Sequence, residues 1–94
     1  MQIETFQIFC DLAELKSFSG AAQKNMISQS AVSQQLSQLE KAFNTALIDR
    51  SRKSFGLTPA GELFYNACKD IISRYGSFHS GLNFLKNSSR SKII

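Results

Sequence analysis

The first hydrophobic stripe in this sequence has helical spacing. Apolar residues recur at intervals of three and four, which places them on one side of a helix over residues 3–15. The residues of this stripe are Ile3, Phe6, Phe9, Cys10 and Ala13. Because Cys10 lies within the stripe, we interpret it as a small core residue rather than a reactive thiol.

A short second helix is predicted over residues 18–25. Ser17 precedes it and can cap its N-terminus. Ala21 and Ala22 are small enough to let another helix approach closely. Asn25 tolerates the left-handed conformation that commonly ends a helix, so we expect the chain to turn there.

A third helix is predicted from Ser28, its N-cap, to about Phe43. Its buried stripe consists of apolar residues three and four positions apart: Val32, Leu36, Leu39 and Phe43. From Ser28 to Leu39 the sequence contains four Ser, four Gln and no charged residue. A helix side that only faces solvent normally carries Glu and Lys, although a merely solvated Ser/Gln side remains the simplest alternative.

A hairpin is predicted after the third helix. Residues 46–50 and 55–57 are short strand-like pieces, and the polar, basic residues 51–54 lie between them. Thr58 then caps a long helix that runs to about residue 85, with Pro59 at its first position. The tail, residues 87–94, is polar, and we expect it to be frayed or disordered.

A heptad-like apolar seam runs along the predicted long helix. Its members are Phe64, Ala67, Ile71, Tyr75, Phe78, Leu82 and Leu85. We expect Leu63, Phe64 and Ala67 to pack onto the domain's own core. The later members, from Ile71 onward, lie beyond that core and predict a dimer interface.

Composition narrows the class of protein. A chain of 94 residues with 43% hydrophobic residues is one globular domain, and a domain this small gains stability by oligomerisation. We find no membrane segment and no signal peptide. Two distant cysteines and one histidine, His79, favour a reduced cytoplasmic protein without a metal or other cofactor, and they argue against an enzyme.

Charge is distributed unevenly along the chain. The net charge is +4, but residues 1–47 carry more acidic than basic groups, and the excess of basic groups lies after Ile48. Arg50, Arg52 and Lys53 lie on or beside the predicted hairpin, where a cationic tip would meet a phosphate backbone or a minor groove. An ordinary basic turn is the alternative, and Arg50 could instead pair with Asp49 or Glu40.

The order of these elements predicts a mainly α, winged helix-turn-helix fold: three helices and a two-stranded wing over residues 1–58, followed by a linker or dimerisation helix over residues 59–86. The third helix would enter the major groove of double-stranded DNA, because Gln and Ser side chains can bond to base edges or phosphates. The candidate contacts on this helix are Ser28, Gln29, Ser30, Ser33, Gln34 and Ser37. Ser17 and Ser19 could donate to phosphate.

Five sequence segments, in this order and spacing, resemble the N-terminal winged helix-turn-helix of LysR-type transcriptional regulators. The resemblance covers about residues 3–72. The segments are Ser17-Phe18-Ser19-Gly20-Ala21-Ala22, Ser28-Gln29-Ser30-Ala31-Val32-Ser33, Leu39-Glu40, Leu47-Ile48-Asp49-Arg50 and Leu57-Thr58-Pro59-Ala60-Gly61.

The resemblance implies a bacterial DNA-binding domain that acts as a dimer on an interrupted palindrome. Gln29, Ser30, Ser33 and Gln34 match the family's DNA-facing positions, and its wing-side arginines correspond to Arg50 and Arg52. The long helix would pair antiparallel with a second copy, and a full-length form could be a tetramer. The rival hypothesis is a winged-helix module that binds another protein.

Three residues and the chain length depart from the family pattern. Asn25 replaces a leucine, whose apolar contact we expect Met26 to supply; Asn44 replaces a glycine; and Ile48 replaces a phenylalanine. Family members carry a C-terminal domain that senses a small inducer, and this sequence stops just after the linker helix. Between an excised fragment and a short natural regulator, we favour the fragment.

Overall fold

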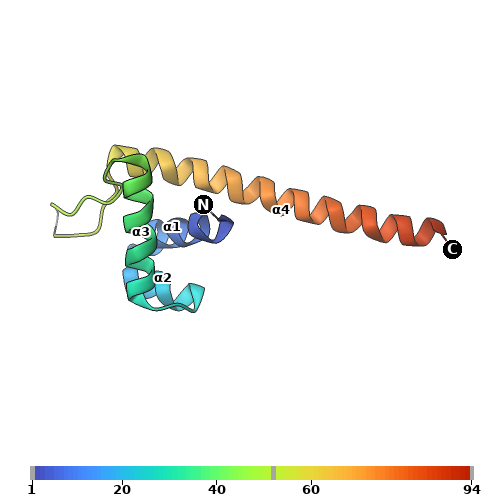
Figure 1. The fold of residues 1–94 in the computed structure, drawn as a ribbon, viewed down its shortest axis with the longest axis horizontal. Coiled ribbons are helices and arrows are strands. Elements are labelled where there is room, and N and C mark those ends of the chain that lie inside the picture. The colour runs from blue at the N-terminus through green and yellow to red at the C-terminus, as the bar shows by residue number, and fades with distance from the viewer. Residues whose placement is uncertain (1, 52, 94) are drawn as a thin grey trace.

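The computed structural model describes residues 2–51 and 53–93, with the side chains of residues up to 88. Its helices are α1 (Ile3–Leu15), α2 (Phe18–Asn25), α3 (Gln29–Phe43) and α4 (Pro59–Ile93). The first three agree with the ranges predicted from the sequence. Figure 1 shows α1, α2 and α3 gathered at one end of α4, which extends far beyond them.

Side-chain caps begin three of the four helices, at the residues that the sequence indicates. The Ser17 Oγ accepts the backbone N–H of Gly20 at 2.9 Å, and the Ser28 Oγ accepts that of Ala31 at 3.0 Å. The Thr58 Oγ1 accepts the N–H of Gly61 at 2.9 Å. Each cap satisfies a donor that has no partner within the helix, so these polar residues fix where the helices start.

The turn after α2 differs from the prediction at two residues. Met26, not Asn25, adopts the left-handed conformation, with φ of 55°. Met26 is 91% exposed and therefore supplies no apolar contact in place of the expected leucine. Asn44, by contrast, is left-handed with φ of 52°, which confirms that it can make the turn in place of glycine.

Asn25 remains helical because its side chain has a buried partner on α1. Its Nδ2 donates to Asp11 Oδ2 at 2.9 Å and to the carbonyl of Ala21 at 2.8 Å. Asp11 is only 1% exposed, and it also accepts from Gln7 at 3.1 Å and pairs with Lys24 at 3.0 Å. A buried carboxylate needs hydrogen-bond partners, and the polar side chain of Asn25 is one of the partners that stabilise Asp11.

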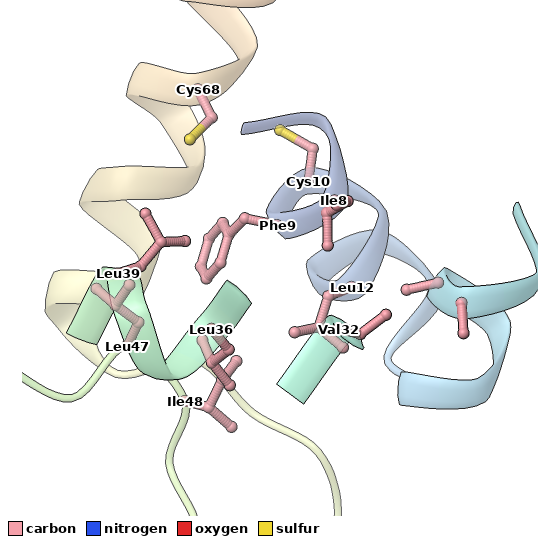
Figure 2. Packing of buried hydrophobic residues seen from close by; sticks show 12 residues of the cluster. Ile8, Phe9, Cys10, Leu12, Val32, Leu36, Leu39, Leu47, Ile48 and Cys68 are labelled. Carbon is pink, nitrogen blue, oxygen red and sulfur yellow. The ribbon is translucent and has the colours of Figure 1, made fainter. Parts of the chain in front are cut away.

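The hydrophobic core lies where α1, α3 and the start of α4 meet (Figure 2). Phe9 on α1 and Leu36 on α3 are at most 2% exposed, and Cys10 is buried among them, which confirms its assignment to the core. The ring of Phe64 on α4 lies 4.9 Å from that of Phe9 and 5.1 Å from that of Phe43.

The core-facing side of α4 is not the one that the sequence suggested. Phe64 packs on the core as predicted, but Leu63 is 75% exposed and Ala67 is also exposed. The inward positions are Phe64, Cys68 and Ile72, each four residues apart. Phe64 therefore leaves the predicted seam, and Leu63 and Ala67 join the later apolar residues on the side of α4 that is free of the core.

The connection between α3 and α4, residues 44–58, brings the two arms of the predicted hairpin together, but not as two regular strands. Within its described residues, the strand pairing is one antiparallel bridge between Ile48 and Leu57. The N–H groups of Leu47 and Ile48 donate to the Glu40 carboxylate at 2.8 and 3.3 Å. Two backbone hydrogen bonds flank this bridge: the Asp49 N–H donates to the Gly56 carbonyl at 2.9 Å, and the Thr58 N–H donates to the Leu47 carbonyl at 3.0 Å. The two arms therefore pair, but over a shorter length than two strands.

Helix α4 continues to Ile93, so the predicted frayed tail is wrong for the described residues. The segment after Lys86 is polar but contains neither Gly nor Pro, and nothing in it interrupts the helical hydrogen bonds. The molecule measures 62 × 25 × 20 Å, with a radius of gyration of 16.9 Å. A compact chain of this length would have a radius near 12 Å, and the projecting α4 accounts for the difference.

Candidate nucleic-acid interface

The uncharged side of α3 is exposed along its length. Val32, Leu36 and Leu39 hold the opposite side in the core with exposures of 2% or less. The polar residues predicted to contact DNA all lie on the solvent side: Ser28, Gln29, Ser30, Ser33, Gln34 and Ser37. Their spacing of three and four brings them together on one surface of one helix.

Gln35 does not belong to this surface. Its Oε1 accepts the hydroxyl of Thr5 on α1 at 3.0 Å, so this glutamine ties α3 to α1. Gln38 is exposed but lies beside Thr5 and Ala42, on the flank that faces α1. The Ser and Gln residues of α3 therefore form two groups: most face solvent, and Gln35 makes a structural contact with α1.

The α2–α3 turn is short and tightly bonded. The N–H of Ile27 donates to the carbonyl of Ala22 at 3.0 Å, and Ala21 and Ala22 are buried under the neighbouring helices. Ser17 is half-buried, and its Oγ lies 3.1 Å from the hydroxyl of Ser19, which is exposed. The N-terminus of α2 thus presents two hydroxyl groups, one of which already serves as a cap.

The basic residues of the connection lie apart from the helical body. Figure 1 shows this loop projecting beyond α3, on the side away from the C-terminus of α4. Arg50 and Lys53 are exposed, and Arg52 lies outside the described residues. The Arg50 guanidinium is 3.5 Å from Glu40 Oε1, so one of the two proposed structural pairs of Arg50 is present.

Glu40 is the residue that sequence reasoning undervalued. Its carboxylate accepts two backbone N–H groups of the loop and pairs with Arg50, so it fixes the loop relative to α3. Its position in the Leu39-Glu40 segment was the available signal. Asp11 is the other missed residue; an acidic residue next to a hydrophobic stripe gave no indication that it would be buried.

Two side chains, Tyr65 and Lys24, have raised pKa values because each is bonded to an acidic residue of α1. The Tyr65 hydroxyl on α4 donates to Glu14 Oε2 on α1 at 2.7 Å, and this bond raises the pKa of Tyr65 to about 12. The hydrogen bond with Asp11 raises the pKa of Lys24. Both contacts join helices, and neither involves the exposed side of α3.

The outer side of α4 carries a continuous apolar row, here called the α4 seam. Its residues follow steps of three and four: Leu63, Ala67, Ile71, Tyr75, Phe78, Leu82 and Leu85. The five predicted dimer residues are between 37% and 64% exposed. At its N-terminal end, the seam joins an open apolar groove of about 270 Å³ that is bordered by Phe43 and Ala60.

Within residues 2–51 and 53–93, no helix combines the length and the apolar character needed to cross a membrane. In the same part of the chain, no three His, Cys, Asp or Glu side chains are grouped so that they could hold a metal ion.

A short helix, a tight turn and a helix with an exposed polar side define a helix-turn-helix protein. Residues 3–62 match the family model of bacterial regulatory helix-turn-helix proteins, lysR family. The chain therefore belongs to the lysR family.

Curated relatives are transcriptional regulators. The chain is 41% identical to the HTH-type transcriptional regulator CysL of Bacillus subtilis over 80% of its own length and 25% of the relative's. It is 31% identical to the transcriptional activator AaeR of Escherichia coli over 93% of its own length and 28% of the relative's. The chain thus spans about a quarter of the length of these proteins.

Solved structures of DNA complexes share the fold. The BenM DNA-binding domain with catB site 1 DNA superposes with a TM-score of 0.85 at 27% identity, over 90% of this chain and 96% of that one. Vibrio fischeri DarR in complex with DNA gives a TM-score of 0.85 at 29% identity, over 93% of this chain and 30% of that one.

Proposed function

We propose that this chain binds double-stranded DNA sequence-specifically through the exposed side of α3, as the DNA-binding domain of a LysR-type transcriptional regulator. The observation that carries the proposal is the side of α3 with no charge and a row of Ser and Gln side chains. Gln makes bidentate bonds to adenine, and Ser bonds to bases or phosphates. The similarity to BenM and DarR bound to DNA supports the same assignment.

Different parts of the molecule contact the DNA bases and the DNA phosphate backbone. Gln29, Ser30, Ser33 and Gln34, near the start of α3, meet base edges or phosphates in the major groove, with Ser37 further along. Arg50, Arg52 and Lys53 bind the flanking backbone or an adjacent minor groove. Ser17, Ser19 and Ser28 donate their hydroxyl protons to phosphate, which the capping role of Ser17 and Ser28 permits because capping uses only the oxygen as acceptor.

The α4 seam pairs with the seam of a second copy in antiparallel orientation. Seven apolar residues over about 33 Å of helix are more than a monomer of this size normally exposes in one row. The free side of this row runs from Leu63 to Leu85, so it begins before Ile71, where the sequence placed the start of the interface. A two-fold dimer presents two α3 helices to an interrupted palindrome.

Whole regulators of this family have activities beyond the DNA-binding domain. Assembly into a tetramer and response to a small-molecule inducer would require a full-length form with a further domain. A location in the cytoplasm follows from DNA binding in a bacterium.

The first experiment selects binding sites from a random duplex library with the purified chain. We expect an enriched two-fold half-site. An unenriched library, together with affinity that does not change between low and high salt, would instead favour the protein-interaction alternative, because phosphate contacts make affinity fall steeply with salt.

The second experiment separates base reading from backbone binding by fluorescence anisotropy. Gln29→Ala should reduce the ratio of selected-site to random-duplex affinity by roughly 10-fold, whereas Gln38→Ala, the same change on the flank facing α1, should leave that ratio unchanged. Lys53→Ala should weaken both affinities equally and reduce the salt slope by about 0.9, with Lys86→Ala on distant α4 as the charge-matched control. Equal losses on both duplexes for Gln29→Ala and Lys53→Ala would refute the division of roles.

A further inference from the structure

The two cysteines of the chain lie opposite each other where α1 meets α4. Cys10 on α1 is 3% exposed and Cys68 on α4 is 0% exposed, and both are free thiols. Figure 2 shows them on the facing sides of the two helices, above the ring of Phe9. They are 58 residues apart in the sequence, so only the fold brings them together.

The two free thiols influence each other's pKa in opposite directions. The Cys68 thiol donates a hydrogen bond to the Cys10 sulfur; this bond lowers the pKa of Cys10 and, together with burial, raises that of Cys68. Lys69 also favours the Cys10 thiolate, whereas burial, Glu14 and Asp11 oppose it. Of the two thiols, Cys10 is the one whose thiolate, the reactive form, is favoured. The sequence indicated a core residue rather than a reactive thiol; Cys10 does lie in the core, but the neighbouring Cys68 could not be foreseen from the sequence.

Cys10 also borders a path from solvent. An open groove of about 200 Å³ runs between α1 and α4, and its lining includes Cys10, Gln7, Glu14, Lys69 and Ser73. Cys68 does not line this groove. Of the two cysteines, Cys10 thus lies on the side from which a small oxidant would enter, and Cys68 has no exposed surface.

We propose that Cys10 and Cys68 form an oxidation site, in which a hydroperoxide converts the two thiols to an intramolecular disulfide that ties α1 to α4. The site needs no DNA and no second copy of the chain, so the test of this oxidation is independent of the proposed DNA binding. A thiolate next to a second thiol and reachable by a small oxidant is the arrangement typical of redox-responsive cysteines.

The reaction balances in two steps. The Cys10 thiolate attacks one peroxide oxygen, the O–O bond breaks, and the departing hydroxide takes up the proton released by the Cys10 thiol, leaving a sulfenic acid and water. The Cys68 sulfur then attacks the Cys10 sulfur, the S–OH bond breaks, and the hydroxyl leaves as water with the Cys68 proton. Two thiols are oxidised by two electrons, and one hydrogen peroxide is reduced to two waters.

The main test treats the reduced, folded chain with a few equivalents of hydrogen peroxide, blocks the remaining thiols and determines intact mass and linked peptides. We expect a loss of two hydrogens, a peptide pair joining Cys10 to Cys68 in a band of monomer size, and full reversal by dithiothreitol. Intact thiols under conditions that oxidise glutathione, disulfides only between chains, or sulfinic acid at Cys10 without a disulfide would each overturn the proposal.

Two matched variants test the order of the steps, with circular dichroism to confirm folding. In Cys68→Ser, whose hydroxyl can replace the Cys68 thiol as hydrogen-bond donor, a sulfenic acid should accumulate at Cys10 and be trapped by dimedone. In Cys10→Ala, Cys68 should remain a thiol under the same treatment. Equal labelling of both variants would contradict the assignment of Cys10 as the attacking sulfur. The main test on the unaltered chain remains decisive if either variant fails to fold.

The disulfide should also stabilise the fold, because it closes a loop of 58 residues in the unfolded chain. We expect the thermal midpoint of the oxidised chain to exceed that of the reduced chain by roughly 10 °C. A midpoint that falls on oxidation would show that the two thiols are not positioned for bonding in the native packing.

Discussion

The Gly61→Ala substitution tests how the start of α4 is seated on the loop. A Cβ at position 61 would lie 2.0 Å from the carbonyl oxygen of Leu47 and 3.0 Å from its carbonyl carbon. Both are backbone atoms that cannot rotate aside. The same carbonyl accepts the N–H of Thr58 at 3.0 Å, and the N–H of Leu47 donates to Glu40 at 2.8 Å. The added methyl group must therefore displace the segment that joins the loop to α4.

The expected cost follows from these contacts. Forcing a methyl group into a closely packed site costs about 1–3 kcal/mol, and weakening the Thr58–Leu47 hydrogen bond adds about 1 kcal/mol. The higher helix propensity of alanine returns up to about 1 kcal/mol. With the full return from helix propensity, the net destabilisation is about 1–3 kcal/mol, which lowers the thermal midpoint of a domain of this size by roughly 5–20 °C.

The assay is thermal and urea unfolding followed by circular dichroism, at one protein concentration. Gly76→Ala is the matched control, since a Cβ at Gly76 meets no atom within 4 Å. That variant should gain up to about 1 kcal/mol from helix propensity alone. A Gly61→Ala protein that is as stable as Gly76→Ala would refute the close contact between α4 and the loop.

Three further predictions follow from other contacts. Asn25→Leu removes a hydrogen bond to the buried Asp11 carboxylate and should destabilise the chain by about 1–2 kcal/mol in urea unfolding; an unchanged midpoint would contradict the role of that bond. Phe78→Asp places a charge in the α4 seam and should shift the chain to monomer in sedimentation equilibrium, whereas a persistent dimer would exclude the seam as interface. Glu14→Gln removes the carboxylate that holds the Tyr65 proton, so the pKa of Tyr65 should fall from about 12 in an ultraviolet titration; a constant pKa would show that another group causes the shift.

The helices could be predicted from the sequence because local signals determine them. Ser17 and Ser28 are N-caps by residue type and position, and the hydrophobic stripes have helical periods, so the bounds of α1 to α3 agree with the structure. Such features depend on residues within a few positions of one another. The same local chemistry gave the start of α4 at Pro59. The similarity to the BenM and DarR structures confirms the fold class that the order of elements indicated, apart from the two strands of the wing.

The errors occurred where a distant residue decides the conformation. Asn25 stays helical because Asp11, fourteen positions earlier, holds its side chain, and Met26 turns outward instead. In the predicted hairpin, the Glu40 side chain binds two N–H groups of the first arm, and the described strand pairing is limited to one bridge. In both cases, the side chain that makes the contact is too far away along the chain for the local sequence to reveal it.

The exposed side of α3 is the part of the candidate site that the sequence specified best. The lack of charged residues along one side of this helix is visible in the sequence without knowledge of the fold. The burial of Val32 and Leu36 then shows which side of α3 faces solvent. The loop residues were harder to place, because Arg50 has a structural partner in Glu40. The DNA contacts assigned to both groups stay predictions.

The length of α4 links the small size of the chain to its proposed assembly. Only the side of α4 that carries Phe64, Cys68 and Ile72 contacts the body, so the second half of this helix has no core of its own. An isolated helix with an exposed apolar row is marginal in water, because tertiary packing supplies most helical stability in proteins. Pairing two seams would bury both rows at once and place the two α3 surfaces at a fixed separation. The Phe78→Asp variant should therefore lose helical content in the second half of α4 as well as the dimer. A monomer of unchanged helicity would show that the seam does not stabilise α4.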